Sequence, residues 1–171
     1  MRTLAARLRG ASMAADKSAP PASTASVSLI VRRRIRATPE RLFEAWTQPA
    51  QLRLWWGPAS VDCIDAEVDL RVGGRYRIAN RFPDGTVLWI TGVFEVIEAP
   101  HKLVYTWGLE PLAGAPERVT VQFQAHHELT EVIVTHQGIP SAQVRDRHDE
   151  GWRGCLDGLA NYLHAATAEG G

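Results

Sequence analysis

The feature of this sequence that most constrains its fold is a change in the spacing of its apolar residues. Between residues 61 and 137 apolar and polar residues mostly alternate, which predicts β-strands, and short turns such as "PDG" at 83–85 separate them. Residues 140–166 instead follow the period of one long helix. Strands joined by short turns pair antiparallel, and this helix is the only predicted element large enough to cover one face of their sheet.

The residues before this region predict one further strand and two short helices. Residues 27–36 alternate as a strand, and Thr38 follows as a good N-cap with Pro39 at the first helical position. Pro49 ends or restarts that helix, and Gly57 ends the second one. We therefore predict an α+β fold, in which a strongly curved antiparallel sheet of about six or seven strands wraps around the C-terminal helix.

The length and the charge balance narrow the classes of protein. The chain has 171 residues, which predicts one domain, and its 19 Lys and Arg residues balance 19 Asp and Glu residues. Nucleic-acid binding normally needs a basic excess, and no apolar run approaches the roughly 18 residues of a membrane span. We therefore expect neither nucleic acid nor a membrane as a partner, and we expect the protein in the cytoplasm.

The cysteines and histidines give no pattern typical of a metal site. Cys63 and Cys155 have neither a CxxC spacing nor a neighbouring histidine, so we expect neither a disulfide nor a zinc site. His126 and His127 point to opposite faces of a predicted strand and cannot hold one ion together. The sequence therefore predicts no bound metal and no cofactor.

The two ends of the chain differ in composition from the part between them. Residues 1–26 are rich in Ala, Ser and Pro and have little apolar surface to bury, which predicts a disordered N-terminal tail. The apolar stretch within them is too short for the central region of a secretory signal. We expect the folded domain at 27–166 and a flexible C-terminus at 167–171.

The long helix carries three glycines on one strip, Gly151, Gly154 and Gly158. Each glycine costs about 1 kcal/mol relative to alanine inside a helix, so the strip needs a physical reason. Either another backbone passes close to it, or the helix bends away and leaves space. The neighbouring helix face carries His148, Trp152, Cys155, Leu156, Leu159 and Leu163.

Several segments appear in an order that resembles a known superfamily. They are "TPERLFEAWTQPAQLRLWWGP", "GGRYRI", "PDG", "TGVFEVIEAPHKLVYTW", "VTVQF", "TEVIVTHQG" and "EGWRGCLDGLANYL". The chain resembles the START-like (SRPBCC, Bet v 1-type) superfamily from Val27 to His164. Within it, the chain is similar to the group of the C-terminal domain of the activator of heat-shock protein 90 ATPase.

This resemblance implies a helix-grip fold with a largely apolar pocket between the sheet and the C-terminal helix. It implies no fixed chemistry, because the superfamily includes lipid and hormone carriers, polyketide cyclases and chaperone activators. The large N-terminal domain of the eukaryotic chaperone activators has no counterpart in these 171 residues. Direct activation of a chaperone is therefore not the first expectation.

Trp55 and Trp56 stand side by side at the end of the second short helix. We expect one indole to face the core and the other to face the mouth of a pocket. Either both simply close the end of the sheet, or one of them is a gate residue that touches a ligand, and we assign Trp56 to that place.

Further aromatic residues are predicted on the inner strand faces. Tyr105 and Trp107 lie two residues apart and therefore share a face, with Trp89 on the preceding strand and Trp152 on the helix. These four side chains either line an aromatic chamber or form an ordinary core.

Tyr76 and Ile78 alternate with Arg75 and Arg77, so one of the two pairs faces inward. We expect Tyr76 in the pocket wall. The arginines are then either solvated, or one of them lies at the pocket mouth and pairs with an anionic group of the ligand.

Two histidines are candidate polar groups of the pocket. His136 is in register with Val132 and Val134, so it faces inward if those two valines do. His148 lies on the apolar face of the long helix. Each is either a core histidine with satisfied hydrogen bonds or a polar anchor for a ligand.

These observations predict a non-catalytic, monomeric or homodimeric protein that binds a small hydrophobic or aromatic molecule. One alternative is a cyclase- or hydrolase-like enzyme in which His136 acts as acid or base, although no nucleophile–base pair is apparent. The other is an interaction module whose partner is a chaperone. The predicted ligand-binding residues are Trp56, Tyr76, Trp89, Tyr105, Trp107, His136, His148 and Trp152.

Overall fold

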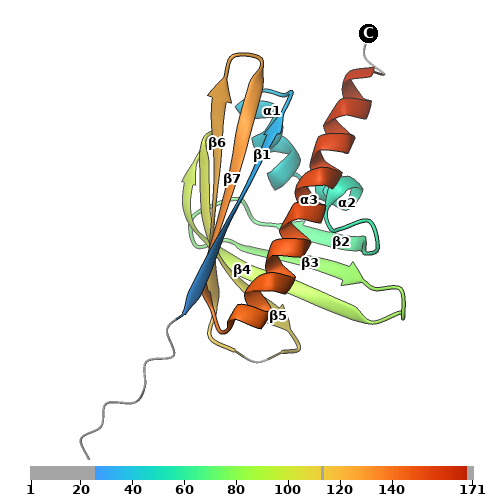
Figure 1. Ribbon diagram of the computed structural model, residues 1–171, viewed down its shortest axis with the longest axis vertical. Coiled ribbons are helices and arrows are strands. Elements are labelled where there is room, and N and C mark those ends of the chain that lie inside the picture. The colour runs from blue at the N-terminus through green and yellow to red at the C-terminus, as the bar shows by residue number, and fades with distance from the viewer. Residues whose placement is uncertain (1–25, 113, 169–171) are drawn as a thin grey trace, which may run out of the picture.

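The computed structural model describes residues 26–112 and 114–168, so most of the predicted tail and residues 169–171 lie outside the described residues. The described residues form one seven-stranded antiparallel sheet and three helices (Figure 1). The helices are α1 (Pro39–Thr47), α2 (Pro49–Trp55) and α3 (Ala142–Ala168). The strands are β1 (Val27–Ile35), β2 (Asp62–Val68), β3 (Arg75–Arg81), β4 (Val87–Glu98), β5 (Lys102–Glu110), β6 (Glu117–His126) and β7 (Leu129–Ile139).

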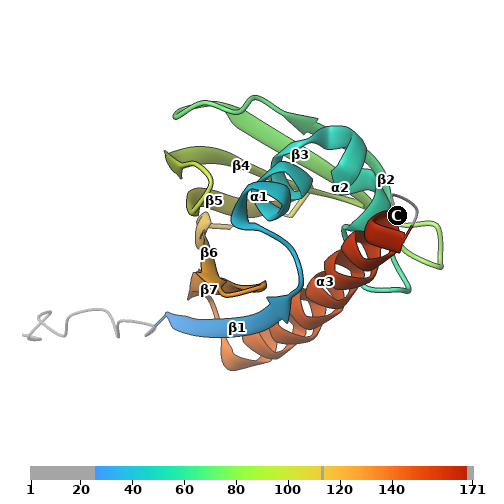
Figure 2. The same cartoon turned by 90° about the horizontal axis from the view of Figure 1, so that it is seen from above.

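The sheet is open and strongly curved. Its strand order is β1-β7-β6-β5-β4-β3-β2, so the first strand pairs with the last one and only one connection crosses the sheet. Figure 2 shows the sheet bending round, with α3 running along the open side between β1 and β2. This arrangement confirms the predicted helix-grip fold.

The helix boundaries follow the predicted capping residues. The Thr38 side-chain oxygen accepts a hydrogen bond of 3.2 Å from the backbone N–H of Arg41, which satisfies one N–H at the start of α1. The Ser141 hydroxyl oxygen accepts a bond of the same length from the backbone N–H of Val144 at the start of α3. Pro49 begins α2 directly after Gln48, as expected of a residue with a fixed φ.

One strand departs from the predicted alternation. The register of β2 and β3 shifts between Cys63 and Asp65, which leaves Ile64 without a partner in the ladder. Because a bulge of one residue reverses the direction of the side chains that follow, Cys63 lies on the same side as Ala66. An unbroken alternation of residues 61–68 would instead place Cys63 on the same face as Asp65.

Two of the three glycines of α3 are explained by a neighbouring backbone. A Cβ atom on Gly158 would lie 2.6 Å from the carbonyl oxygen of Trp55, and one on Gly154 would lie 2.6 Å from the Cβ of Pro58. The segment after α2 therefore lies directly on α3, which is the first of the two predicted alternatives. A Cβ on Gly151 would meet no described atom within 4 Å.

The core lies between the concave face of the sheet and the three helices. The helix face predicted from the apolar period is buried except for His148, which is half-buried. The largest fully buried apolar side chains come from every layer and include Leu42, Leu52, Leu103, Phe123, Ile139, Leu156, Leu159 and Leu163. The interior is thus mostly filled by side chains, and polar groups within it stand out.

Candidate functional site

The structure separates the eight predicted site residues into two groups and one exception. Trp56, Tyr76 and Tyr105 line a small cavity near the middle of the molecule. Trp107, His136, His148 and Trp152 meet around one buried glutamate, farther along α3 toward its N-terminal end. Only Trp89 joins neither group.

Trp89 lies on the outer face of the sheet, which corrects the prediction that it lines the inner wall. Its neighbour Ile90 is buried in the core, and successive strand residues face opposite sides. The Trp89 ring packs against the guanidinium group of Arg77 at 4.2 Å and pairs in register with Ala79. The inward pair on β3 is thus Tyr76 and Ile78, so Arg77 does not lie at the mouth of the inner cavity.

The inner cavity has a volume of about 20 Å³, which is room for about one water molecule. We call it the aromatic cavity, because five of its eight lining residues carry aromatic rings and all eight are uncharged. The rings of Tyr76 and Tyr105 lie 5.1 Å apart, edge to face. The lining residues are Trp46, Leu52, Trp56, Val68, Tyr76, Ile78, Phe94 and Tyr105.

The polar atoms of this wall differ in their hydrogen bonds. The Tyr76 hydroxyl donates to the carbonyl oxygen of Thr106 at 2.8 Å, and Trp46 Nε1 donates to the Tyr105 hydroxyl oxygen at 3.3 Å. The buried Nε1 of Trp56 has no hydrogen-bond partner among the described residues. Burial raises the pKa of Tyr76 and of Tyr105, so both hydroxyls keep their protons.

The Trp55-Trp56 pair shows two different roles. Trp55 is a core residue, because its Nε1 donates to the carbonyl oxygen of Ala45 at 2.9 Å and its ring packs 5.0 Å from that of Trp46. Trp56 is also buried, but it lines the aromatic cavity on one side and a larger groove on the other. The sequence expectation placed one indole in the core and the other at the mouth of a pocket, and the structure buries both, with Trp56 between the cavity and the groove.

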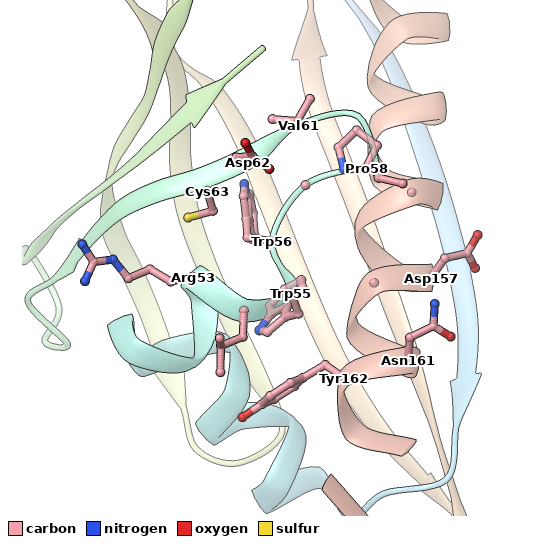
Figure 3. A pocket seen from close by; sticks show the side chains of 15 residues that line it. Arg53, Trp55, Trp56, Pro58, Val61, Asp62, Cys63, Asp157, Asn161 and Tyr162 are labelled. Carbon is pink, nitrogen blue, oxygen red and sulfur yellow. The ribbon is translucent and has the colours of Figure 1, made fainter. Parts of the chain in front are cut away.

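The larger groove is open to solvent and has a volume of about 520 Å³. Figure 3 shows Trp55, Trp56 and Pro58 on one side of it and Asp157, Asn161 and Tyr162 of α3 on the other. We call it the surface groove. Its charged side chains already have ion-pair partners, since Asp157 lies 3.0 Å from Arg33 and Asp62 lies 3.0 Å from Arg81.

The second group of predicted residues surrounds Glu117, the first residue of β6. His136 Nε2 lies 2.6 Å from Glu117 Oε2, and His148 Nε2 lies 3.0 Å from the same oxygen. The two imidazole rings stack with centroids 4.7 Å apart, and Trp107 packs edge to face against both. We call Glu117, His136 and His148 the His–Glu cluster.

Sequence analysis missed Glu117 because its position depends on strand register. His136 pairs with Val119, two residues along β6 from Glu117, so both side chains share one sheet face. The carboxylate follows the loop after β5, and in the sequence alone it looks like an exposed loop residue. Only a correct prediction of the register between β6 and β7 could have placed Glu117 beside His136.

The hydrogen bond from Trp152 fixes the protonation of His136. Trp152 Nε1 lies 3.0 Å from His136 Nδ1, and because an indole nitrogen only donates, Nδ1 must carry the lone pair. His136 is therefore neutral and carries its proton on Nε2. This nitrogen faces Glu117, but the carboxylate oxygen Oε2 lies off the line of an ideal hydrogen bond. Burial lowers the pKa of His136, more than the Glu117 carboxylate raises it.

Glu117 is held as an anion. Burial alone would raise its pKa, but the hydrogen bonds from His136 and His148 outweigh burial and lower the pKa to about 2. The three residues bring one ligand atom each within 4.8 Å, a spacing that could suit a metal ion. However, a proton on His136 Nε2 blocks coordination there, so the donor set fits a hydrogen-bonded cluster better than a metal site.

Neither ring nitrogen of His136 faces the aromatic cavity, because Trp152 and Glu117 occupy both. The enzymatic alternative requires His136 to face a substrate in the aromatic cavity as acid or base, and this arrangement does not provide that. What the site offers is an uncharged, mostly aromatic wall, which suits the binding of an apolar molecule.

Comparisons with known proteins agree with the fold. The model of the family described as "Activator of Hsp90 ATPase homolog 1-like protein" matches residues 36–164. No curated protein matches the chain. None of the described helices is long and apolar enough to cross a membrane.

Solved structures of bacterial proteins resemble the chain over most of its length. The AHSA1 protein from Silicibacter pomeroyi is 24% identical with a TM-score of 0.73, covering 82% of this chain and 99% of that chain. The AHSA1-like protein from Aeromonas hydrophila is 26% identical with a TM-score of 0.70, covering 82% and 94%. A protein from Nitrosomonas europaea is 21% identical with a TM-score of 0.71, covering 82% and 96%.

Proposed function

This chain belongs to the family of Activator of Hsp90 ATPase homolog 1-like proteins, within the START-like superfamily, and on this premise we propose that it binds a small hydrophobic or aromatic molecule without converting it. The observation that carries this proposal is the wall of the aromatic cavity. Eight uncharged residues, five of them aromatic, line a space between the sheet and the short helices α1 and α2. Ligand pockets are typically concave and apolar with a few converging polar groups.

The aromatic cavity must enlarge to hold such a molecule. Its 20 Å³ admits about one water molecule, whereas pockets for drug-sized ligands measure on the order of 300–1,000 Å³. The surface groove of about 520 Å³ lies on the other side of Trp56. Rotation of this indole would join the two spaces, so we assign Trp56 as the gate and the groove as the access route.

The two alternative functions receive less support from the site. A cyclase- or hydrolase-like enzyme needs an acid or base that faces its substrate, and both ring nitrogens of His136 are engaged elsewhere. A chaperone-associated interaction module agrees with the family description, but it gives no reason for an aromatic cavity.

Native mass spectrometry of the freshly purified protein tests the proposal. We expect extra mass that disappears on denaturation, and we expect Trp56→Ala to lose it because this substitution opens the wall to solvent. Trp89→Ala is the matched control, since it removes a tryptophan from the outer face of the sheet.

The purified chain can also be tested with an added probe, the tricyclic hydrocarbon fluorene. A wild-type protein that carries no extra mass and does not bind fluorene would contradict the proposal. Equal retention of ligand by the wild type and by Trp56→Ala would show that the ligand lies elsewhere.

A further inference from the structure

The hydrogen bond between Trp152 and His136 exists only while His136 is neutral. Trp152 Nε1 lies 3.0 Å from His136 Nδ1, and an indole nitrogen only donates, so Nδ1 has to accept. An imidazolium ring carries a proton on each nitrogen and accepts at neither of them. Uptake of a proton on Nδ1 would therefore place two N–H groups face to face, and this bond between α3 and β7 would break.

The other side of the His136 ring favours the charged form. His136 Nε2 lies 2.6 Å from Glu117 Oε2, and the pKa of Glu117 is lowered to about 2, so this carboxylate stays an anion in mild acid. A carboxylate this close compensates the charge of an imidazolium. His136 thus has two arrangements, a neutral ring bonded to Trp152 and a charged ring paired with Glu117 alone.

Two titratable side chains contact the His136 ring among the described residues. They are Glu117 of β6 and His148 of α3, whose ring stacks on that of His136. The other two neighbouring strands contribute Trp107 of β5 and Leu29 of β1, and neither carries a charge. Burial lowers the pKa of His136 below 6.5, and a positive charge on His148 acts in the same direction. The charged arrangement therefore belongs to acidic solution.

Trp152 connects this equilibrium to the wall of the aromatic cavity. Its side chain is buried, and its ring centroid lies 6.1 Å from that of Trp46 and 5.7 Å from that of Trp56. Both of these tryptophans line the aromatic cavity. Because a close-packed interior leaves no room for one ring to turn alone, a movement of Trp152 has to move the rings that pack against it.

Resting on the proposed function, we infer that His136 and Trp152 form an acid-sensitive switch, in which a proton on His136 Nδ1 releases the Trp152 indole and weakens binding in the aromatic cavity. The proton comes from the solvent, and only hydrogen bonds change. At neutral pH the indole is held as the structure shows it. In acid the imidazolium keeps its contact with Glu117, and the indole turns away. By linkage, a bound ligand must also make His136 harder to protonate.

An NMR titration of the ligand-free protein from pH 7 to pH 4 tests the switch. Labelling of tryptophan and histidine with 15N reports both partners in one sample. We expect the Trp152 indole signal to move upfield along the protonation curve of the His136 ring, while the signals of the other five tryptophans move less. A His136 ring that stays neutral until the protein unfolds, or a Trp152 signal that does not follow it, would overturn the inference.

Two variants separate the switch from ordinary packing. Trp152→Phe removes the N–H that opposes the proton, so His136 should take up its proton at a higher pH than in the wild type. Trp89→Phe is the matched control on the outer face of the sheet and should leave this titration unchanged. His136→Asn offers an oxygen acceptor that does not titrate, so the Trp152 signal should become independent of pH. Equal titration of His136 in the two tryptophan variants would contradict the coupling.

The affinity for fluorene over the same pH range separates the inference from the proposed function. We expect the wild type to bind fluorene at pH 7 and to lose about fivefold or more in affinity where His136 takes up its proton, a size typical of coupling between two sites. Fluorene does not ionise in this range, so the loss reports on the protein. A constant affinity would overturn the inference and leave the binding function intact. Absence of binding at pH 7 would overturn both.

Discussion

The aromatic cavity lies between the sheet and the short helices α1 and α2, whereas the His–Glu cluster lies between the sheet and α3, and their polar groups differ in one respect. In the cluster, Glu117 lies against both histidines, and Trp152 donates to His136. In the cavity wall, Trp56 Nε1 and the Tyr105 hydroxyl have no acceptor among the residues that the structure describes. Since buried polar groups normally have partners, the unpaired donors of the cavity agree with the proposal that a ligand binds there.

Trp152 connects the two regions. It donates to His136 on one side, while its ring stacks 6.1 Å from that of Trp46 and lies 5.7 Å from that of Trp56 on the other. The cluster therefore fixes the orientation of an indole that supports the cavity wall. We regard the cluster as a structural anchor for α3, distinct from the proposed binding site in the cavity.

Breaking the anchor should have the largest effect. Glu117→Ala would leave the His136 Nε2–H buried without its acceptor, and we expect a loss of about 3–4 kcal/mol in the free energy of unfolding. Glu95→Ala is the matched control, because its carboxylate pairs with the exposed Arg118 and should contribute less than about 1 kcal/mol. Urea denaturation measures both, and equal losses would show that the cluster is not an anchor.

A smaller loss of stability is expected where the segment after α2, which carries the proposed gate residue Trp56, packs on α3. Gly158→Ala would place a Cβ 2.6 Å from the Trp55 carbonyl oxygen, so we expect a loss of about 1–3 kcal/mol. Gly151→Ala adds the same methyl group where the structure describes no atom within 4 Å, and it should stabilise the helix by up to about 1 kcal/mol. Thermal unfolding compares them, and similar shifts of Tm would contradict the close packing.

The anchor also predicts how stability depends on pH. The folded-state pKa of Glu117 is lowered from 4.5 to about 2, so its contribution is present above pH 4.5 and is lost as the pH falls toward 2. The pKa of His136 is lowered from 6.5, so the unfolded state takes up its proton first and stability begins to fall below pH 6.5. Both groups therefore make the fold sensitive to acid.

Urea denaturation between pH 7 and pH 3 tests this dependence. Glu117→Gln removes the carboxylate, so its stability should change less than that of the wild type below pH 4.5. Parallel curves for the two proteins would mean that Glu117 is not held as an anion by the cluster.

The smallest effect is expected when a tryptophan is replaced by phenylalanine, once in the His–Glu cluster region and once in the aromatic cavity. Trp152→Phe loses a hydrogen bond and leaves His136 Nδ1 without its donor, whereas Trp56→Phe removes an N–H that has no acceptor among the described residues. Both lose a similar apolar area, so we expect Trp152→Phe to be less stable by about 1–2 kcal/mol. A reversed order in chemical denaturation would contradict the distinction between the regions.

The fold could be predicted from the sequence because local signals agreed with one another. The caps at Thr38 and Ser141 and the change of apolar spacing each indicated an element that the structure contains. The predicted site was less complete, since it depended on which face of a strand each residue occupies. The bulge at Ile64 reversed Cys63, Trp89 lies on the outer face, and Glu117 entered the cluster only through the register of β6 with β7.

The most direct test of the central claim observes the indole N–H groups themselves. The six tryptophans of the chain give six indole signals in a protein labelled with 15N-tryptophan, and Trp→Phe variants assign them. On addition of fluorene, we predict that the Trp56 Nε1–H signal moves most, because Trp56 lines the aromatic cavity. The Trp152 Nε1–H should move less, since it already donates to His136. A Trp56 signal that stays in place while fluorene binds would contradict the account.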